Sequence, residues 1–150
     1  MYALRQLREL ECAYAPALLT FAGTVVCNGV YEDALVGGYS FFILMTKLPG
    51  QVLDLGQYCK LSPAERDEIR TAFREALTDV WDCGIVPQDT AARNIMWDAA
   101  EKKNDCTLLD PNTETPPDFQ EGVYDDWELS EEVVSLYRRR SGWDKTVQQT

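Results

Sequence analysis

The strongest local signal in the sequence is a helix with a defined start and end in the middle of the chain. Ser62, Pro63 and Glu65 follow the capping-box pattern, in which a serine hydroxyl and a glutamate carboxylate satisfy free backbone N–H groups at a helix start. Gly84 is expected to end the helix, because glycine readily adopts the left-handed conformation that follows a helix C-terminus. The pattern predicts a helix over about 62 to 83 with one face in a core. The residues of that face recur every three or four positions: Ile69, Ala72, Phe73, Ala76, Leu77, Val80 and Trp81.

Two kinds of apolar pattern precede this helix. The apolar residues from Leu4 to Phe21 recur at three- and four-residue steps, which predicts an N-terminal helix that Pro16 kinks or ends. Two runs of β-branched, aromatic and aliphatic residues, 24–30 and 39–45, predict two strands. The acidic and glycine-rich residues between these runs would join them as a hairpin.

Shorter elements follow the long helix. Apolar runs at 94–97 and 106–109 predict two short strands separated by a charged turn. The residues from Trp127 to Arg140 predict a last helix. Helices and antiparallel strands therefore mix along a chain whose 150 residues suit one hydrophobic core, so the expected fold class is α+β.

The net charge of −11 limits the possible partners. Residues 104–150 hold 11 of the 25 Asp and Glu but only 4 of the 14 Lys and Arg. Because nucleic acids and anionic membranes are themselves negative, binding to either is not expected. No stretch approaches the roughly 18 apolar residues of a membrane span, and the N-terminus lacks the apolar core of a signal peptide. The expected location is the cytoplasm.

The cysteine and histidine content narrows the chemistry. The five cysteines are an odd number with no C-x-x-C pair, which is typical of reduced thiols rather than of a disulfide framework or a zinc site. Histidine is absent, which excludes a His-dependent catalytic triad and a His-ligated metal site.

One ordered pattern has a chemical meaning. Asp89 and Asn94 have D-x-x-x-x-N spacing after the long helix, and Asp110 follows two leucines at the end of a predicted strand. In phosphoryl transfer an Asp orients or deprotonates the acceptor hydroxyl, while an Asn and a second Asp hold Mg²⁺ against the phosphates. The spacing lets the loop reverse direction. We therefore expect Asp89 and Asn94 to face one cleft with Asp110 beside them.

In this order the chain resembles the hinge and large-lobe part of protein-kinase-like or aminoglycoside-phosphotransferase-like domains, of the atypical kind abundant in filamentous fungi. Residues 10–18 are similar to the helix whose glutamate pairs with the ATP-binding lysine, with Glu11 or Glu9 as the candidate. Residues 42–50, F-I-L-M-T-K-L-P-G, resemble the strand and hinge whose backbone contacts adenine.

The resemblance implies two cofactors, ATP and Mg²⁺, and a partial protein-kinase-like fold over residues 1–120. This fold would have a helix, short antiparallel strands and a hinge, then a mainly helical large-lobe segment with a catalytic-loop hairpin. Residues 121–150 would form an acidic C-terminal helix and tail, packed on the same domain or following it. The implied site residues are Asp89 for catalysis, Met45, Thr46 and Lys47 for the nucleotide, and Asn94 and Asp110 for the metal.

Three departures from the family pattern bear on function. Pro87 stands where the family usually has a histidine, Pro-Asn follows Asp110, and no glycine-rich phosphate loop or lysine-bearing strand precedes the first helix. The expected protein is therefore a truncated, catalytically impaired kinase-like remnant that acts by partner binding or vestigial nucleotide binding. The surface left by the amino-terminal lobe should be apolar, which favours self-association or a protein partner.

Two alternatives stay open. The chain could be an ATP-dependent phosphotransferase that uses Asp89 as base and Asn94 with Asp110 on Mg²⁺. It could instead be an acidic structural or interaction protein unrelated to kinases. The acidic stretch from Tyr124 to Glu132 fits a docking surface or a solvated helix face, and the solvated face is the simpler interpretation.

Overall fold

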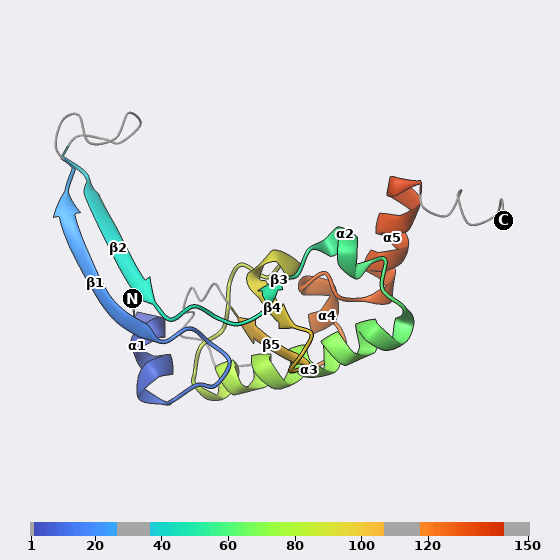
Figure 1. Cartoon of the computed structure of the whole chain (residues 1–150), viewed down its shortest axis with the longest axis horizontal. Helices are drawn as coiled ribbons and strands as arrows, with labels where there is room; N and C mark the ends of the chain where they lie inside the picture. The colour runs from blue at the N-terminus through green and yellow to red at the C-terminus, as the bar shows by residue number, and fades with distance from the viewer. Residues whose placement is uncertain (1, 27–36, 107–117, 143–150) are drawn as a thin grey trace.

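The structure is a computed structural model that describes residues 2–26, 37–106 and 118–142. Helices alternate with two small antiparallel sheets along the chain (Figure 1). The mixed α+β class expected from the sequence is therefore confirmed. In chain order the elements are α1 (Tyr2–Glu9), β1 (Leu18–Val25), β2 (Tyr39–Met45), β3 (Gln51–Val52), α2 (Leu55–Tyr58), α3 (Pro63–Asp82), the 3₁₀ helix η1 (Ala92–Asn94), β4 (Ile95–Asp98), β5 (Lys103–Cys106), α4 (Val123–Asp126) and α5 (Glu131–Ser141).

The long helix α3 lies along one side of the body and carries the core (Figure 1). Its start is the predicted capping box: the Glu65 N–H donates to Ser62 Oγ at 3.3 Å, and the Ser62 N–H donates to the Glu65 carboxylate at 2.8 Å. The predicted apolar stripe is buried. Phe73 packs with its ring centroid 5.1 Å from that of Trp127. The rest of the core comes from distant segments: Leu53, Tyr58, Ile95, Leu129 and Val134.

The segment that follows α3 forms the strands β4 and β5, which join β3 in a three-stranded antiparallel sheet with the order β3-β4-β5. Gly50, just before β3, has a φ of +75°, and a Cβ at this position would lie 2.3 Å from the Trp97 carbonyl oxygen. Only glycine permits such a backbone conformation and approach. The predicted strand at 94–97 is confirmed as β4. The next strand, β5, lies earlier than the predicted 106–109, and residues 107–109 lie outside the described residues.

β1 and β2 form a separate two-stranded ribbon that projects from the body (Figure 1). The paired residues run from Val25 opposite Tyr39 to Leu18 opposite Met45. The helix α1 lies at the base of the ribbon, where Arg8 Nη1 donates to the Leu18 carbonyl at 2.8 Å. The predicted strand at 39–45 is therefore confirmed as β2.

The N-terminal prediction is wrong beyond residue 9. The helix α1 ends there, Glu11 has a left-handed φ of +55°, and a strand begins at Leu18. Leu18 and Phe21 therefore lie on β1 rather than on a helix, and residues 10–18 are not the glutamate-bearing helix that the resemblance implies. The strand predicted at 24–30 begins earlier than expected, and its residues from Cys27 onward lie outside the described residues.

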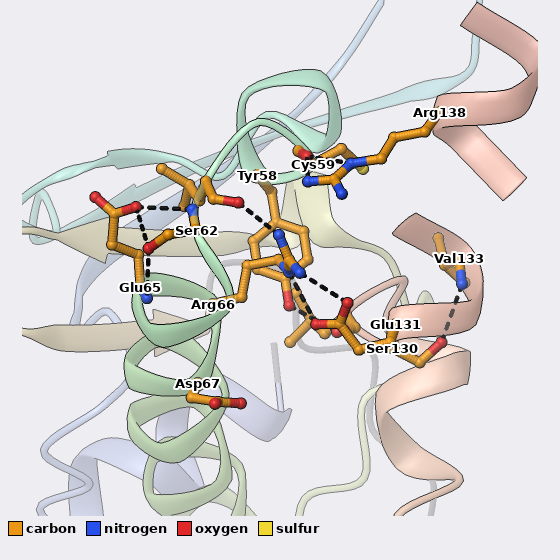
Figure 2. A network of polar contacts seen from close by, with 12 residues as sticks. Tyr58, Cys59, Ser62, Glu65, Arg66, Asp67, Ser130, Glu131, Val133 and Arg138 are labelled. Atoms are coloured by element: carbon orange, nitrogen blue, oxygen red, sulfur yellow. Dashed lines mark hydrogen bonds and ion pairs between the residues drawn. The ribbon is translucent and has the colours of Figure 1, made fainter. Parts of the chain in front are cut away.

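The acidic C-terminal segment packs on the body through its apolar side chains, while Asp125, Asp126, Glu131 and Glu132 are exposed, as expected for a solvated charged face. Trp127 is 2% exposed in the core. Glu131 accepts hydrogen bonds from Arg66 Nε at 2.9 Å and Nη2 at 2.7 Å (Figure 2). The Arg138 guanidinium donates to the Cys59 carbonyl at 2.7 and 3.0 Å (Figure 2). The last helix, predicted over 127–140, is α5 and begins at Glu131, while α4 ends at Asp126 before the predicted start.

Candidate functional site

The loop 89–94, which contains the predicted catalytic pair, is fixed from two sides by distant parts of the chain. The Ala92 N–H donates to the Glu128 carboxylate at 3.1 Å, from the connection between α4 and α5. The Leu53 N–H, just after β3, donates to the Ile95 carbonyl at 2.9 Å, where the loop continues into β4. The loop therefore has one defined shape between α3 and the β4-β5 hairpin.

Asn94 and Asp89 are in direct contact inside this loop. Asn94 Nδ2 donates to the Asp89 backbone carbonyl at 2.8 Å and to Asp89 Oδ2 at 2.9 Å. Asn94 is 3% exposed, whereas the Asp89 side chain is 51% exposed. A buried amide thus orients a carboxylate at the surface, because two hydrogen bonds from one nitrogen fix both the backbone and the side chain of Asp89.

Arg93 is a third member of the loop, which the sequence analysis missed. Its Nη2 donates to both carboxylate oxygens of Asp89, at 2.8 and 3.0 Å. The hydrogen bond from Asn94, reinforced by the charge of Arg93, lowers the pKa of Asp89 below its usual value, although desolvation opposes this. The carboxylate is therefore ionised at neutral pH. The missed signal is an arginine four residues after an aspartate, a spacing at which opposite charges meet on a helical turn.

A magnesium site is not formed by the described residues. The third expected ligand, Asp110, lies outside them. Within the described ranges no three Asp, Glu, His or Cys side chains are grouped so that they could hold a metal ion. Arg93 already binds the Asp89 carboxylate, and Asn94 directs its amide nitrogen to the same group. A cation would have to compete with the Arg93 guanidinium for those oxygens.

The predicted nucleotide residues lie at the end of β2 and just beyond it. Thr46 is paired with Ala17: its N–H donates to the Ala17 carbonyl at 2.9 Å, and its hydroxyl accepts from the Ala17 N–H at 2.9 Å. Met45 and Lys47 are exposed. Both of these Thr46 hydrogen bonds connect β2 to the start of β1 and not to the loop 89–94. The structure joins the two segments through β3, which pairs with β4.

The described cysteines do not supply a reactive thiol. They are free, as the sequence predicts for them, and burial is the largest cause of a raised pKa at each. The pKa reaches about 12 at Cys12 and at Cys106. A thiol with such a pKa stays protonated at neutral pH and is a poor nucleophile. The remaining two described cysteines are Cys59 and Cys83.

Comparison with known proteins does not assign the chain to a family. No family model matches it, and no curated protein is similar enough in sequence to count as a relative. In the part of the chain that the structure describes, no helix combines the length and the apolar character needed to cross a membrane. The function must therefore be argued from the geometry of the loop 89–94 and its surroundings.

Proposed function

We propose that the chain is a protein-kinase-like segment that works by binding and does not itself transfer phosphate. The observation that supports this most is the contact between Asp89 and Asn94 at the spacing of a kinase catalytic loop. The loop lies between a long helix and an antiparallel hairpin. This is the order in which the resemblance places the large-lobe helix, the catalytic loop and its hairpin.

The environment of the Asp89 carboxylate favours binding over catalysis. A general base needs a free lone pair within reach of the acceptor hydroxyl. Asp89 already accepts two hydrogen bonds from Arg93 and one from Asn94, which occupy three of the roughly four acceptor sites of a carboxylate, and its lowered pKa makes it a weaker proton acceptor. Pro87 also replaces the histidine of the family pattern. The loop is better suited to keeping its own shape than to moving a proton.

A titration with MgATP tests whether the proposed binding role includes nucleotide binding. A ligand that binds only the folded state stabilises it, so millimolar MgATP should raise the unfolding midpoint by about one or two degrees. Asn94→Ala should remove this shift, because Asn94 orients the loop. An unchanged midpoint in the native chain would exclude nucleotide binding and leave a protein partner as the only remaining role.

A second candidate function is an active phosphotransferase, and one observation favours it. The Arg93 side chain is 65% exposed, so water screens its ion pair with Asp89 and a substrate could displace it. Asp89 would then serve as base, with Asn94 and Asp110 on Mg²⁺. Incubation with labelled ATP separates the two candidates. Binding alone predicts the same background from the native chain and from Asp89→Asn, whereas turnover that Asp89→Asn loses would establish the phosphotransferase.

A further inference from the structure

One face of the β1-β2 ribbon is entirely apolar. Residues opposite each other in an antiparallel pair share a face, as do residues two apart on a strand. A Cβ on Gly23 would lie 3.0 Å from the Phe41 ring, which shows that this ring lies over the glycine. The rings of Tyr39 and Phe41 stack with their centroids 6.4 Å apart. By the register, the apolar face consists of Phe21, Val25, Tyr39, Phe41, Ile43 and Met45, with Gly23 beneath Phe41. The register shifts between Leu18 and Thr20, and Leu18, opposite Met45, is buried at the base of the ribbon.

The opposite face of the ribbon has a different composition. Phe42 and Leu44 are its only large apolar side chains, and the other positions are small or carry hydroxyl groups. One apolar face and one mixed face are typical of an antiparallel sheet that packs on one side and meets water on the other. The remaining residues of the mixed face are Thr20, Ala22, Thr24 and Ser40.

The apolar face is nevertheless largely exposed. Tyr39 is 77% exposed and Phe41 65% exposed, and the other four large side chains are between 39% and 50% exposed. Together these six residues leave roughly 600 Å² in water, so two such faces would bury at most about 1,200 Å², the lower bound for a specific protein interface. An isolated two-stranded ribbon is only marginally stable in water, so its apolar face needs cover.

The distribution of charge allows a second copy of the chain to provide this cover. Residues 18–26 and 37–45 contain no Asp, Glu, Lys or Arg. The Arg5 guanidinium of α1 lies 5.0 Å from the centroid of the Phe21 ring at the base of the ribbon, so two copies can meet without burying a charge beyond that end of the face. Each copy has a net charge of −11, with the excess concentrated in residues 104–150. The helix α4, which carries Asp125 and Asp126, lies in the body and away from the ribbon (Figure 1). Contact through the ribbons therefore keeps these carboxylates of two copies apart.

We propose that the chain forms a symmetric dimer in which the apolar face of one ribbon packs against the same face of a second copy. A two-fold interface requires one patch to be complementary to itself, and an apolar face whose strands carry no charged residue meets that requirement. The inference goes beyond the proposed function, because it uses no residue of the loop 89–94. Its test contains no nucleotide, so its failure would leave the nucleotide titration unaffected.

The experiment measures the mass of the full chain by sedimentation equilibrium over a concentration series. Phe41→Lys places a charge on the apolar face, and Phe42→Lys places the same charge on the mixed face one residue away. Both variants lower the magnitude of the net charge, so neither adds general repulsion. Tyr39→Lys is a second variant at the most exposed position of the apolar face, where no contact with the body can be lost. Far-UV circular dichroism checks that each variant stays folded.

The native chain should reach twice the monomer mass of 17.0 kDa. Phe41→Lys and Tyr39→Lys should each weaken dimerisation at least about a hundredfold, since both copies bury the new charge. Phe42→Lys should change dimerisation by less than about threefold. The proposal is overturned by a native chain that stays monomeric at several hundred micromolar, by assemblies larger than a dimer, or by equal effects of the Phe41 and Phe42 variants.

Discussion

The helix α3 and the strand β2 both carry many large apolar side chains, but they bury them to opposite degrees. Phe73 and Leu77 on α3 are fully buried, whereas Tyr39 and Phe41 on β2 are mostly exposed. The cause lies in their neighbours. α3 packs against β5, and its buried residues share the core with residues of α2, α4 and the start of β4. β2 pairs only with β1 among the described strands. Apolar content therefore predicts that a segment will be covered, but not whether its own chain covers it.

Removing a large ring from each region is the strongest test of this difference. Phe73→Ala deletes a buried ring that packs on Trp127, and we expect a loss of about 3–5 kcal/mol in the free energy of unfolding. Phe41→Ala should cost less than about 0.5 kcal/mol in dilute solution, where the ribbon is uncovered. Urea unfolding followed by tryptophan fluorescence measures both values. Similar costs for the two variants would mean that the ribbon belongs to the core.

The loop 89–94 should behave as part of the body. Asn94→Ala removes two hydrogen bonds from a buried amide, so we expect unfolding to become easier by about 1–3 kcal/mol. Arg93→Ala is the matched control, because its ion pair with Asp89 is exposed and should contribute under about 0.5 kcal/mol. Thermal or urea unfolding compares the two. An Arg93 variant as unstable as the Asn94 variant would show that the ion pair, not the buried amide, holds the loop.

The start of α3 provides a test with a smaller expected effect: whether the capping box, a local sequence signal, stabilises the fold. Ser62→Ala breaks the capping box, and we expect a cost of about 1 kcal/mol. Ser135→Ala, at an exposed interior position of α5, is the control and should change the free energy of unfolding by less than about 0.5 kcal/mol. Calorimetric unfolding of both variants gives the comparison. If the Ser62 variant is no less stable than the control, tertiary packing alone fixes this end of α3.

The smallest expected effect is a pH dependence at the contact between α3 and α5. Hydrogen bonds from Arg66 are the main cause that lowers the pKa of Glu131 from 4.5 to about 2. Because the folded-state pKa is the lower one, the stabilising contribution is complete above pH 4.5 and is lost as the pH falls towards 2. The Glu131 side chain is 53% exposed, so water screens the interaction and we expect less than about 1 kcal/mol.

Urea unfolding of the native chain and of Glu131→Gln across this pH range measures the contribution. The stability difference between the two chains should shrink as the pH falls. A difference that stays constant would show that the charge of Glu131 does not matter, only its hydrogen bonds.

Features encoded locally were predicted well from the sequence. The helix expected at 62–83 is α3, with its capping box, and the strand expected at 39–45 is β2. The N-terminal error has a physical cause. Leu18 and Phe21 fit a helical repeat, yet pairing with β2 places them on a strand, and this long-range contact overrides the local pattern.

The candidate site was predicted only where its contacts are local in sequence. The Asp89–Asn94 contact follows from a spacing of five residues within one loop. The Glu128 carboxylate that holds the loop at Ala92 lies 36 residues away, and Glu131 lies 65 residues from Arg66. No local spacing points to such contacts. The expected solvated acidic face is present at Asp125, Asp126 and Glu132, but the contacts of Glu128 and Glu131 with the body were not predicted.

Hydrogen exchange at the ribbon amides tests most directly whether the ribbon depends on a second copy of the chain. Exchange is followed by mass spectrometry at low-micromolar and at several hundred micromolar protein. Dimerisation stabilises the ribbon by mass action, so peptides covering β1 and β2 should exchange more slowly at the higher concentration, while peptides covering α3 should not change. Ribbon exchange that is independent of protein concentration would contradict this account.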